Sequence, residues 1–328
     1  MGVSRRGFLR AAGAVAGALA LSGCGGSSNA DERVYVGIVN GEPAESGYRK
    51  ATDKSMHEAL DQRDDVAPEY AYESKSKDQT TSARELVQKG VKYLLASPES
   101  NEGWEALLKD AYDAGTLTIL FDRALDVDEE LYAAAVVADA GAEARDAVDW
   151  LAGRGLERCD IVHIQGVADS AAQAAHAAVL DEAVEARDGW SVVARKPASG
   201  NAVVAQEITQ EVIDSGKSFN VIYAESDEMA RGAVVALDSS GITHGKNGDV
   251  VVMAFDHNTW ALEEVLAGNW NFDGWRDASP GPAVADVLAR LEAGEEPAEK
   301  TVTLEHGWVD CDAITQDYVD ERGLQRDE

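Results

Sequence analysis

Short apolar runs with the length of β-strands alternate with longer amphipathic stretches along the chain from Arg33 onward. The apolar runs are VYVGIV, VKYLLA, LTILF, YAAAVVA, DIVHIQ, NVIYA and DVVVMAF. Alanine-rich segments with helical periodicity separate them, for example YRKATDKSMHEAL, GWEALLKDAYDAG and DEMARGAVVALDSSG. Continuously apolar strands that alternate with helices form parallel sheets covered on both faces. The sequence therefore predicts an α/β protein with doubly wound parallel sheets.

The chain has more strand and helix units than one small sheet holds, and 45% of its residues are hydrophobic, enough for two cores. A charged connection in FDRALDVDEELYAAAVVADAG interrupts the alternation and marks a passage between two lobes. The later segment AGNWNFDGWRDASPGPAVADVLARLEAG adds a strand and a helix that return to the first lobe. We predict an N-lobe of residues 33–137 with 276–304, and a C-lobe of residues 138–275 with 305–328.

The charge balance is strongly acidic, with a formal net charge of −31 at pH 7. The acidic residues are dispersed along the chain instead of forming one tail. A polyanion repels phosphate backbones and anionic lipid surfaces, which argues against nucleic-acid binding. Dispersed acidity of this kind needs salt to screen its self-repulsion, and it resembles the proteins of extreme halophiles, especially halophilic archaea.

The N-terminal segment SRRGFLRAAGAVAGALALSGC has the order charged, apolar and small-residue that is typical of an export signal. Its apolar part is too short for a confident membrane span. SRRGFLR resembles a twin-arginine signal, and LSGC resembles a lipobox, which implies lipidation of Cys24. We expect residues 1–23 to be removed, residues 24–32 to form a flexible tether, and the mature protein to be anchored to the outer face of the cytoplasmic membrane.

Two further cysteines, Cys159 and Cys311, either form a disulfide or remain as free buried thiols, and their spacing does not decide between the two. No cluster of cysteines or histidines has the spacing of a metal site. We therefore expect neither a metal nor a cofactor.

In doubly wound sheets, ligands bind beyond the carboxyl ends of the strands. The candidate binding residues are therefore the polar and aromatic side chains near these ends. They are Tyr48, Arg49, Ser97, Asp122, Arg123, His176, Ser226, Asp227, Asp256 and His257.

Several fragments, in order and spacing, are similar to one known family: ESGYRKA, ASPESNEGWEALLKDAYDAG, TILFDRALDV, IVHIQGVADSAA, VIYAESDEMARGAVVALDSSGI and VVMAFD. Residues 33–310 resemble the ribose- and galactofuranose-binding branch of the type 1 periplasmic binding proteins. The resemblance implies two α/β lobes joined by three crossovers, with a sugar held in the cleft between them. It also implies a hinge that closes on the sugar and presents it to an ABC permease in the membrane.

The matched residues suit a sugar chemically. Asp122 and Arg123 can accept hydrogen bonds from neighbouring hydroxyls and donate to them, and charged hydrogen bonds are the stronger kind. Asp256 ends an apolar strand, where a buried carboxylate needs a partner, so we predict that it binds a hydroxyl. An exposed ion pair is the alternative for Asp122 and Arg123.

Two aromatic positions are candidate stacking plates for the sugar ring. Tyr48 and Arg49 match an aromatic and polar pair of the family, and Tyr48 either stacks on the sugar or packs in the core. Trp275 falls where relatives carry a polar crossover residue that touches ligand, and it either supplies a second plate or has a structural role. Trp104 is expected to pack in the core.

The chain departs from the family pattern mainly in the second lobe. His176 stands where relatives have a ligand-binding arginine, and Gly200 replaces an aromatic residue that stacks on the ligand. Ser226 replaces an asparagine, with Asp227 beside it. The ligand therefore differs in shape or chemistry on that side, and the resemblance does not establish galactofuranose itself.

Two other functions share this pattern: a secreted carbohydrate-active enzyme and a ligand-binding subunit that feeds a membrane sensor. Asp122 and Asp256 could serve acid–base chemistry if suitably spaced. However, the sequence has no G-x-S-x-G elbow, H-E-x-x-H, P-loop or G-x-G-x-x-G motif. A repressor is disfavoured because no basic helix-turn-helix precedes Arg33. We predict a monomeric, non-enzymatic binding protein that captures a sugar for an ABC importer.

Overall fold

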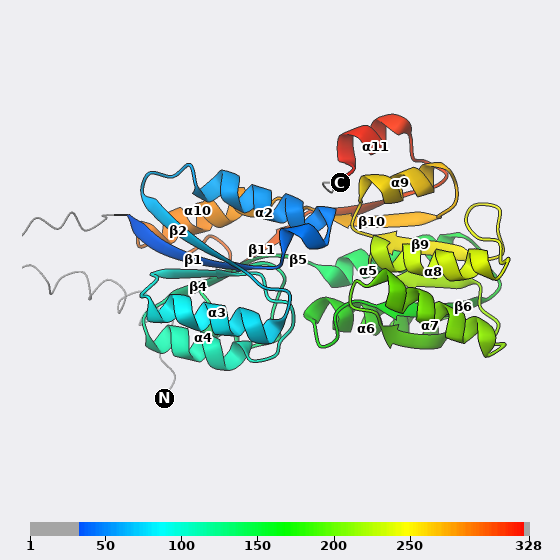
Figure 1. The fold of residues 1–328 in the computed structure, drawn as a ribbon, viewed down its shortest axis with the longest axis horizontal. Helices are drawn as coiled ribbons and strands as arrows, with labels where there is room; N and C mark the ends of the chain where they lie inside the picture. The colour runs from blue at the N-terminus through cyan, green and yellow to red at the C-terminus, as the bar shows by residue number, and fades with distance from the viewer. Residues whose placement is uncertain (1–32, 325–328) are drawn as a thin grey trace, which may run out of the picture.

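The computed structural model describes residues 33–324. The predicted signal (residues 1–23), Cys24 and the tether (residues 24–32) lie outside the described residues. Two α/β lobes, each built on a largely parallel sheet, lie end to end along the long axis of the molecule (Figure 1). This arrangement confirms the predicted fold class.

The first lobe contains a six-stranded sheet whose neighbouring strands are all parallel. The strand order is β11-β5-β4-β3-β1-β2. Its central strands are buried along their whole length because helices cover both faces. The strands are β1 Val34–Asn40, β2 Val66–Tyr72, β3 Tyr93–Ala96, β4 Leu117–Asp122, β5 Ala134–Ala138 and β11 Thr301–Leu304.

The second lobe repeats this plan with the strand order β12-β10-β9-β8-β6-β7. Five of its strands are parallel, and β12 pairs antiparallel with β10 at one edge. The strands are β6 Cys159–Gln165, β7 Trp190–Pro197, β8 Val221–Ala224, β9 Val251–Phe255, β10 Phe272–Arg276 and β12 His306–Asp310.

Helices cover both faces of each sheet and enclose separate apolar cores (Figure 1). In the first lobe, α2 and α10 pack on one face, and α3 and α4 on the other. In the second lobe, α5 and α6 pack on one face, and α7, α8 and α9 on the other. The helices are α2 Gly47–Leu60, α3 Ser76–Gln88, α4 Trp104–Asp113, α5 Ala140–Gly153, α6 Ala171–Glu185, α7 Ala202–Asp214, α8 Asp227–Ser239, α9 Thr259–Leu266, α10 Gly281–Glu292 and α11 Gln316–Arg322, with short 3-10 turns η1 Pro43–Glu45 and η2 Glu129–Leu131.

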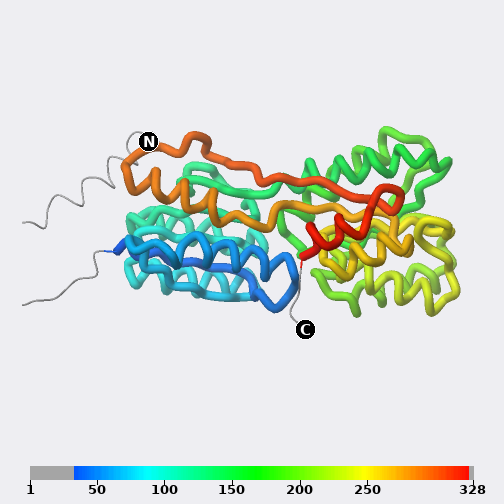
Figure 2. Tube along the Cα trace, turned by 90° about the horizontal axis from the view of Figure 1, so that it is seen from above, coloured from blue at the N-terminus to red at the C-terminus, as the bar shows by residue number. Residues whose placement is uncertain are grey.

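The chain passes between the lobes at three places, between β5 and α5, between β10 and α10, and between β11 and β12. The second and third crossovers run side by side along the length of the molecule (Figure 2). Arg276 is the last residue of β10 and so directly precedes the second crossover. Short crossovers of this kind allow the lobes to rotate about them as rigid bodies.

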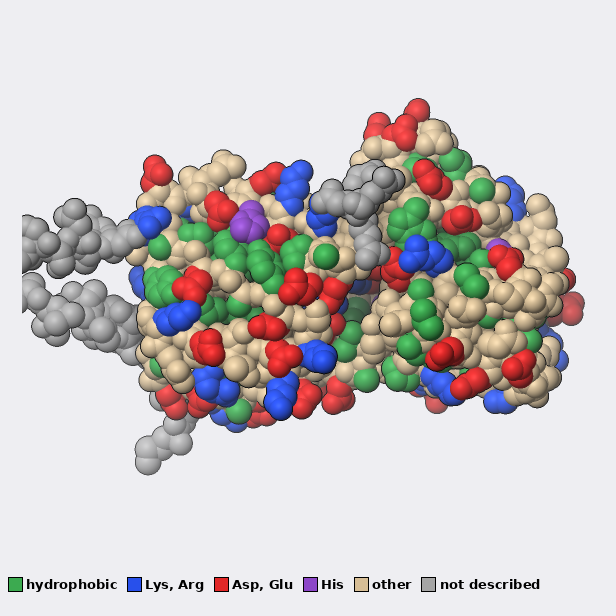
Figure 3. Space-filling model, viewed as in Figure 1, with side chains coloured by type: hydrophobic (Ala, Val, Ile, Leu, Met, Phe, Trp, Pro, Cys, Tyr) green, Lys and Arg blue, Asp and Glu red, His purple; other side chains and the backbone are tan. Residues whose placement is uncertain are grey.

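Acidic side chains are spread over both lobes on the face shown in Figure 3 and alternate there with fewer basic ones. This matches the dispersal of Asp and Glu along the sequence. Within residues 33–324, no helix is both long enough and apolar enough to cross a bilayer.

Cys159 and Cys311 are both buried and both free thiols. Of the two alternatives left open by the sequence, the structure therefore has free thiols and no disulfide between these residues. Burial raises the pKa of the Cys159 thiol to about 11, which makes it an inert packing residue at neutral pH.

Two helical glycines give a prediction about packing between α7 and α8. A Cβ added to Gly232 would lie 2.0 Å from the carbonyl oxygen of Ala202, whereas one added to Gly153 would meet nothing within 4 Å. Gly232→Ala should lower the free energy of unfolding by about 1–3 kcal/mol because of overpacking. Gly153→Ala is the matched control and should leave it unchanged or raise it by up to ~1 kcal/mol. Denaturant unfolding at constant salt measures both, and equal effects would contradict this account.

Candidate ligand-binding site between the lobes

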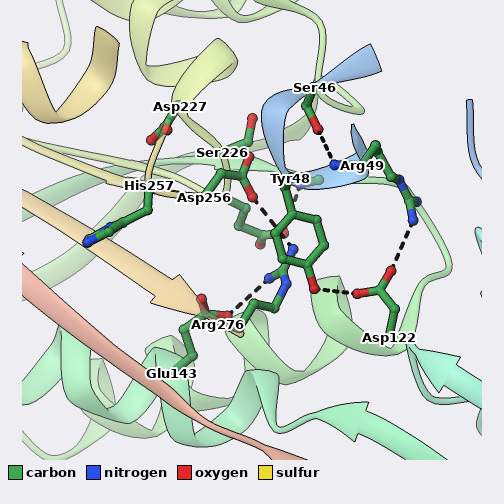
Figure 4. Close-up of polar contacts among 12 residues, drawn as sticks. Ser46, Tyr48, Arg49, Asp122, Glu143, Ser226, Asp227, Asp256, His257 and Arg276 are labelled. Atoms are coloured by element: carbon green, nitrogen blue, oxygen red, sulfur yellow. Dashed lines mark hydrogen bonds and ion pairs between the residues drawn. The ribbon is translucent and has the colours of Figure 1, made fainter. Parts of the chain in front are cut away.

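The carboxylate of Asp122 is the centre of the polar groups at the strand ends of the first lobe (Figure 4). It ends β4, is buried, and has a left-handed φ of 63°. Tyr48 donates its hydroxyl to Oδ1 of Asp122 at 2.5 Å. Arg49 Nη1 and Ser97 Oγ donate to Oδ2 at 3.0 and 2.9 Å. Burial opposes ionisation of this carboxyl, but the guanidinium groups of Arg49 and Arg123 outweigh it and hold the pKa of Asp122 below its usual value.

The N-terminus of α2 places Tyr48 and Arg49 in this cluster. Ser46 caps the helix by accepting a hydrogen bond from the backbone N–H of Arg49 at 3.1 Å. The first turn then directs Tyr48 and Arg49 toward the end of β4. Both side chains are buried at this point, with 3% of each residue exposed.

Glu99 connects Arg49 and Arg123 of the first lobe. Its Oε2 accepts from Arg49 Nη2 at 2.8 Å and also from Arg123 Nη1. Burial acts to raise the pKa of Glu99, but the guanidinium groups of Arg123 and Arg49 have the larger effect. The pKa is therefore below its usual value, and the group stays ionised. Arg123 therefore has a fixed position, and its Nε lies 3.8 Å from Asp122 Oδ2.

Arg276 is the corresponding centre in the second lobe. Its Nη1 donates to Oε2 of Glu143 on α5 at 3.2 Å, and its Nη2 lies 3.6 Å from Oδ1 of Asp256, which follows β9. His176 on α6 lies 3.7 Å from the same Glu143 oxygen and pairs through Nδ1 with the hydroxyl of Tyr223 at 2.6 Å. The second lobe thus presents a cation held between two carboxylates.

The pKa of Asp256 is raised, whereas the pKa of Glu143 is lowered. Burial, with the neighbouring Glu143 and Asp273, outweighs the attraction of Arg276 and raises the pKa of Asp256 to about 7. Burial also disfavours ionised Glu143, but Arg276 and His176 overcome it and lower its pKa. Glu143 is therefore the permanent counterion of Arg276, and Asp256 titrates near neutral pH.

The two lobes enclose a cavity of about 380 Å³. Three predicted residues line it, namely Asp122, Arg123 and His176. Eight further polar residues that line it were not among the predicted ligand-binding residues: Glu99, Ser100, Asp139, Ser170, Glu225, Arg276, Thr301 and Thr303. The first crossover also contributes to the wall through residues 138–141.

The other predicted residues lie away from this wall. Tyr48, Arg49 and Asp256 belong to the surrounding polar network and do not line the cavity. Ser226 caps α8 by accepting from the N–H of Met229 at 3.3 Å.

Asp227 holds a contact between the lobes. It is buried, and its Oδ2 accepts from both N and Nδ2 of Asn258 at 2.9 Å. Asn258 in turn accepts a hydrogen bond from the N–H of Gly47 in the first lobe at 3.2 Å. Burial, together with Asp273 and Asp256, raises the pKa of Asp227 well above its usual value.

Trp275 and Arg276 are neighbours on β10 and point to opposite faces, as successive strand residues do. The ring of Trp275 lies 6.2 Å from that of His257 and 5.4 Å from the guanidinium of Arg322. His257 itself is buried and pairs with Tyr318 at 2.9 Å. Arg276, and not Trp275, therefore lines the cavity next to the crossover where the sequence predicted a ligand contact.

The strand-end rule points to several of the residues that sequence reasoning missed, among them Arg276, which ends β10. Glu99 follows β3, and Glu225 directly follows β8, where it accepts from Gly166 N at 2.8 Å and pairs with His163. Glu143 lies inside a helix and carries no such signal. Among residues 33–324, no group of histidine, cysteine and acidic residues could hold a metal ion.

Comparison with known proteins agrees with this geometry. The periplasmic binding protein domain family matches residues 11–296. The galactofuranose-binding protein YtfQ of Escherichia coli (strain K12) is 27% identical over 268 residues, which are 79% of this chain and 83% of that protein. The ribose import binding protein RbsB of the same strain is 26% identical over 212 residues, which are 64% of this chain and 66% of that protein.

A solved structure shows the same fold at low sequence identity. It is the periplasmic binding protein component of the arabinose ABC transporter from Shewanella sp. ANA-3, bound to α- and β-L-arabinofuranose. The superposition has a TM-score of 0.80 at 22% identity and covers 88% of this chain and 95% of that chain.

Two hinged α/β lobes around a polar cavity define a solute-binding protein. The chain belongs to the periplasmic binding protein family. The prediction that it is a binding protein of this family and not an enzyme is confirmed by the family match and by its relatives, which are binding proteins.

The raised pKa of Asp256 gives a prediction about pH. The folded state favours the neutral form of Asp256. Its contribution to the free energy of unfolding is therefore fully present below pH ~4 and is lost as the pH rises through about 7. Asp256→Asn stays neutral at every pH. The advantage of this variant in free energy of unfolding should be about 3 kcal/mol larger at pH 8 than at pH 5. Chemical denaturation at constant salt measures the difference.

Asp149→Asn, which removes an exposed carboxylate from α5, is the matched control for the loss of one negative charge. A difference between Asp256→Asn and wild type that is the same at both pH values would contradict the prediction.

Proposed function

We propose that the protein is an extracytoplasmic solute-binding lipoprotein that captures a sugar between its lobes and delivers it to an ABC importer in the membrane. Family membership supports the capture of a small solute. The relatives named above for galactofuranose and ribose binding support a sugar. The observation that carries the proposal is the interlobe cavity, whose wall combines the ion pair of Arg123 and Glu99 from the first lobe with Arg276 from the second lobe.

The cavity wall suits an uncharged polyhydroxylated ligand. Its volume of about 380 Å³ lies at the small end of the range for small-molecule sites, ~300–1,000 Å³. Arg123 and Arg276 are donors, and Asp122 and Glu99 are acceptors, so adjacent hydroxyls can bond to both kinds of group. Each of these charges already has a partner of opposite sign, and a neutral ligand therefore leaves none of them unpaired.

The export route and the anchor rest on sequence. SRRGFLR supports twin-arginine export, and LSGC supports a lipid on Cys24 at the outer face of the cytoplasmic membrane. The net charge of −31 supports a protein adapted to high salt. A monomer is sufficient for this function because both lobes of the cavity come from one chain.

Binding measurements test the proposed function. A thermal-shift screen at high salt against pentoses, hexoses in both ring forms, nucleosides and polyols should give at least one sugar that raises the melting temperature. Calorimetry then gives its affinity, and the sugar should be recovered unchanged. If no sugar binds, or if the sugar is chemically converted, the proposal is wrong.

Arg123→Met should weaken binding of that sugar by about 1.5–3 kcal/mol, a factor of roughly 10 to 100, because a charged hydrogen bond is lost. Arg84→Met is the matched control, since Arg84 makes an exposed ion pair with Asp110 at 3.5 Å on the first lobe. Equal affinities for the two variants would remove Arg123 from the site.

A further inference from the structure

Arg276 belongs to two structural features at once. Arg276 lines the interlobe cavity, and its guanidinium group also contacts the first lobe. The side chain is only 16% exposed and is anchored in its own lobe by Glu143 and Asp256. A cation fixed in this way keeps its position without paying the rotamer entropy of an exposed arginine.

The contact with the first lobe is made with the ring of Tyr48. The guanidinium carbon of Arg276 lies 4.6 Å from the ring centroid, within the range of a cation–π interaction. Tyr48 is equally fixed, because its hydroxyl donates to Asp122 and its residue is 3% exposed. Cation–π contacts are strongest when both partners are desolvated, as they are here.

Among the cation–π contacts of residues 33–324, the pair of Arg276 and Tyr48 is the one that joins the two lobes. Two hydrogen-bonded contacts between the lobes accompany it. Gly47, next to Tyr48, donates to Asn258, and Asn101 donates to the carbonyl oxygen of Asp169 at 3.1 Å. The stack therefore lies within a set of contacts that exist only when the lobes are close together.

The stack of Arg276 on Tyr48 also argues against stacking of the sugar ring on Tyr48. The guanidinium occupies a face of the ring, and Tyr48 does not line the cavity. A ligand in the cavity instead contacts Arg276, which lines it together with Asp122, Arg123 and His176.

We propose that Arg276 is a closure and specificity residue, which holds the lobes together through its stack on Tyr48 while its guanidinium group forms a wall of the ligand cavity. The closure part concerns the protein by itself. The specificity part rests on the proposed function, because it assigns Arg276 a contact with the sugar and excludes stacking of the sugar on Tyr48.

Small-angle X-ray scattering of the full-length chain at high salt, without added sugar, tests the closure part. Arg276→Met and Tyr48→Leu should each increase the radius of gyration, and the double variant should add little to either, because one contact is lost in all three. Tyr48→Phe keeps the ring and loses the same hydroxyl bond to Asp122 as Tyr48→Leu, so its radius of gyration should be smaller than that of Tyr48→Leu. Arg187→Met is the matched control, since it removes a cation–π contact with Trp190 at 5.0 Å inside the second lobe.

Circular dichroism confirms that each variant is folded, and the comparison of Tyr48→Leu with Tyr48→Phe decides the matter if Arg276→Met does not fold. Scattering of Tyr48→Leu identical to that of Tyr48→Phe would overturn the closure role. This outcome does not depend on whether any sugar binds, so it is separate from a failure of the proposed function.

Affinities for the sugars found in the thermal-shift screen test the specificity part. Compared with Tyr48→Phe, which lacks the same hydroxyl, Tyr48→Leu should weaken every sugar by a similar factor, on the order of tenfold, because the two variants differ only in the ring that makes the closure contact. Arg276→Met should change the ratio of affinities between sugars, because a wall of the cavity is altered. A change in that ratio for Tyr48→Leu, or an unchanged ratio for Arg276→Met, would overturn the specificity role.

Discussion

The charge of Asp122 is buried between the lobes, and the arrangement of the surrounding side chains depends on keeping it paired. An isolated carboxylate in such a place costs several kcal/mol, whereas one held by several donors is tolerated. Its donors come from the start of α2 and from the end of β3, and Arg276 of the second lobe adds a further favourable charge. The pairing therefore fixes the first turn of α2 against the sheet. The attraction between Asp122 and Arg276 also favours the approach of the second lobe.

The backbone at the strand ends is strained where it faces the other lobe. Asp122, Asp256 and His257 have φ angles of 63°, 121° and 62°, which L-residues rarely adopt. Such conformations persist only where the surroundings over-determine them, as the ion pairs of Asp122 and Asp256 do. The strain turns the chain sharply after each strand, and at Asp122 it leaves the carboxylate residue in the cavity wall between the lobes. Binding geometry is thereby set on rigid strands instead of mobile loops.

Sequence patterns identified the central strands well and the edge strands poorly. The continuous apolar runs correspond to β1, β3, β4, β5, β6, β8 and β9, which helices cover on both faces. β2 and β7 lie at the sheet edges, are mostly half-buried, and read as mixed segments such as VAPEYAY and WSVVARKP. The same limit applies to the site. Asp122, Arg123 and His176 line the cavity, and the rule that ligands meet strand ends selected all three. Glu143 lies within a helix and gave no signal.

The sequence by itself determined the fold class and the division into two lobes, and it placed Asp122 and Arg123 at the end of a strand, because apolar periodicity and strand-end position are local properties. Only the tertiary structure decided which side chains from the two lobes meet. Whether Trp275 or Arg276 faces the cavity depends on strand register, and a shift of one residue exchanges the two faces. Arg276 and Tyr48 are far apart in the chain, and their stack exists because two separately folded sheets present their strand ends to each other.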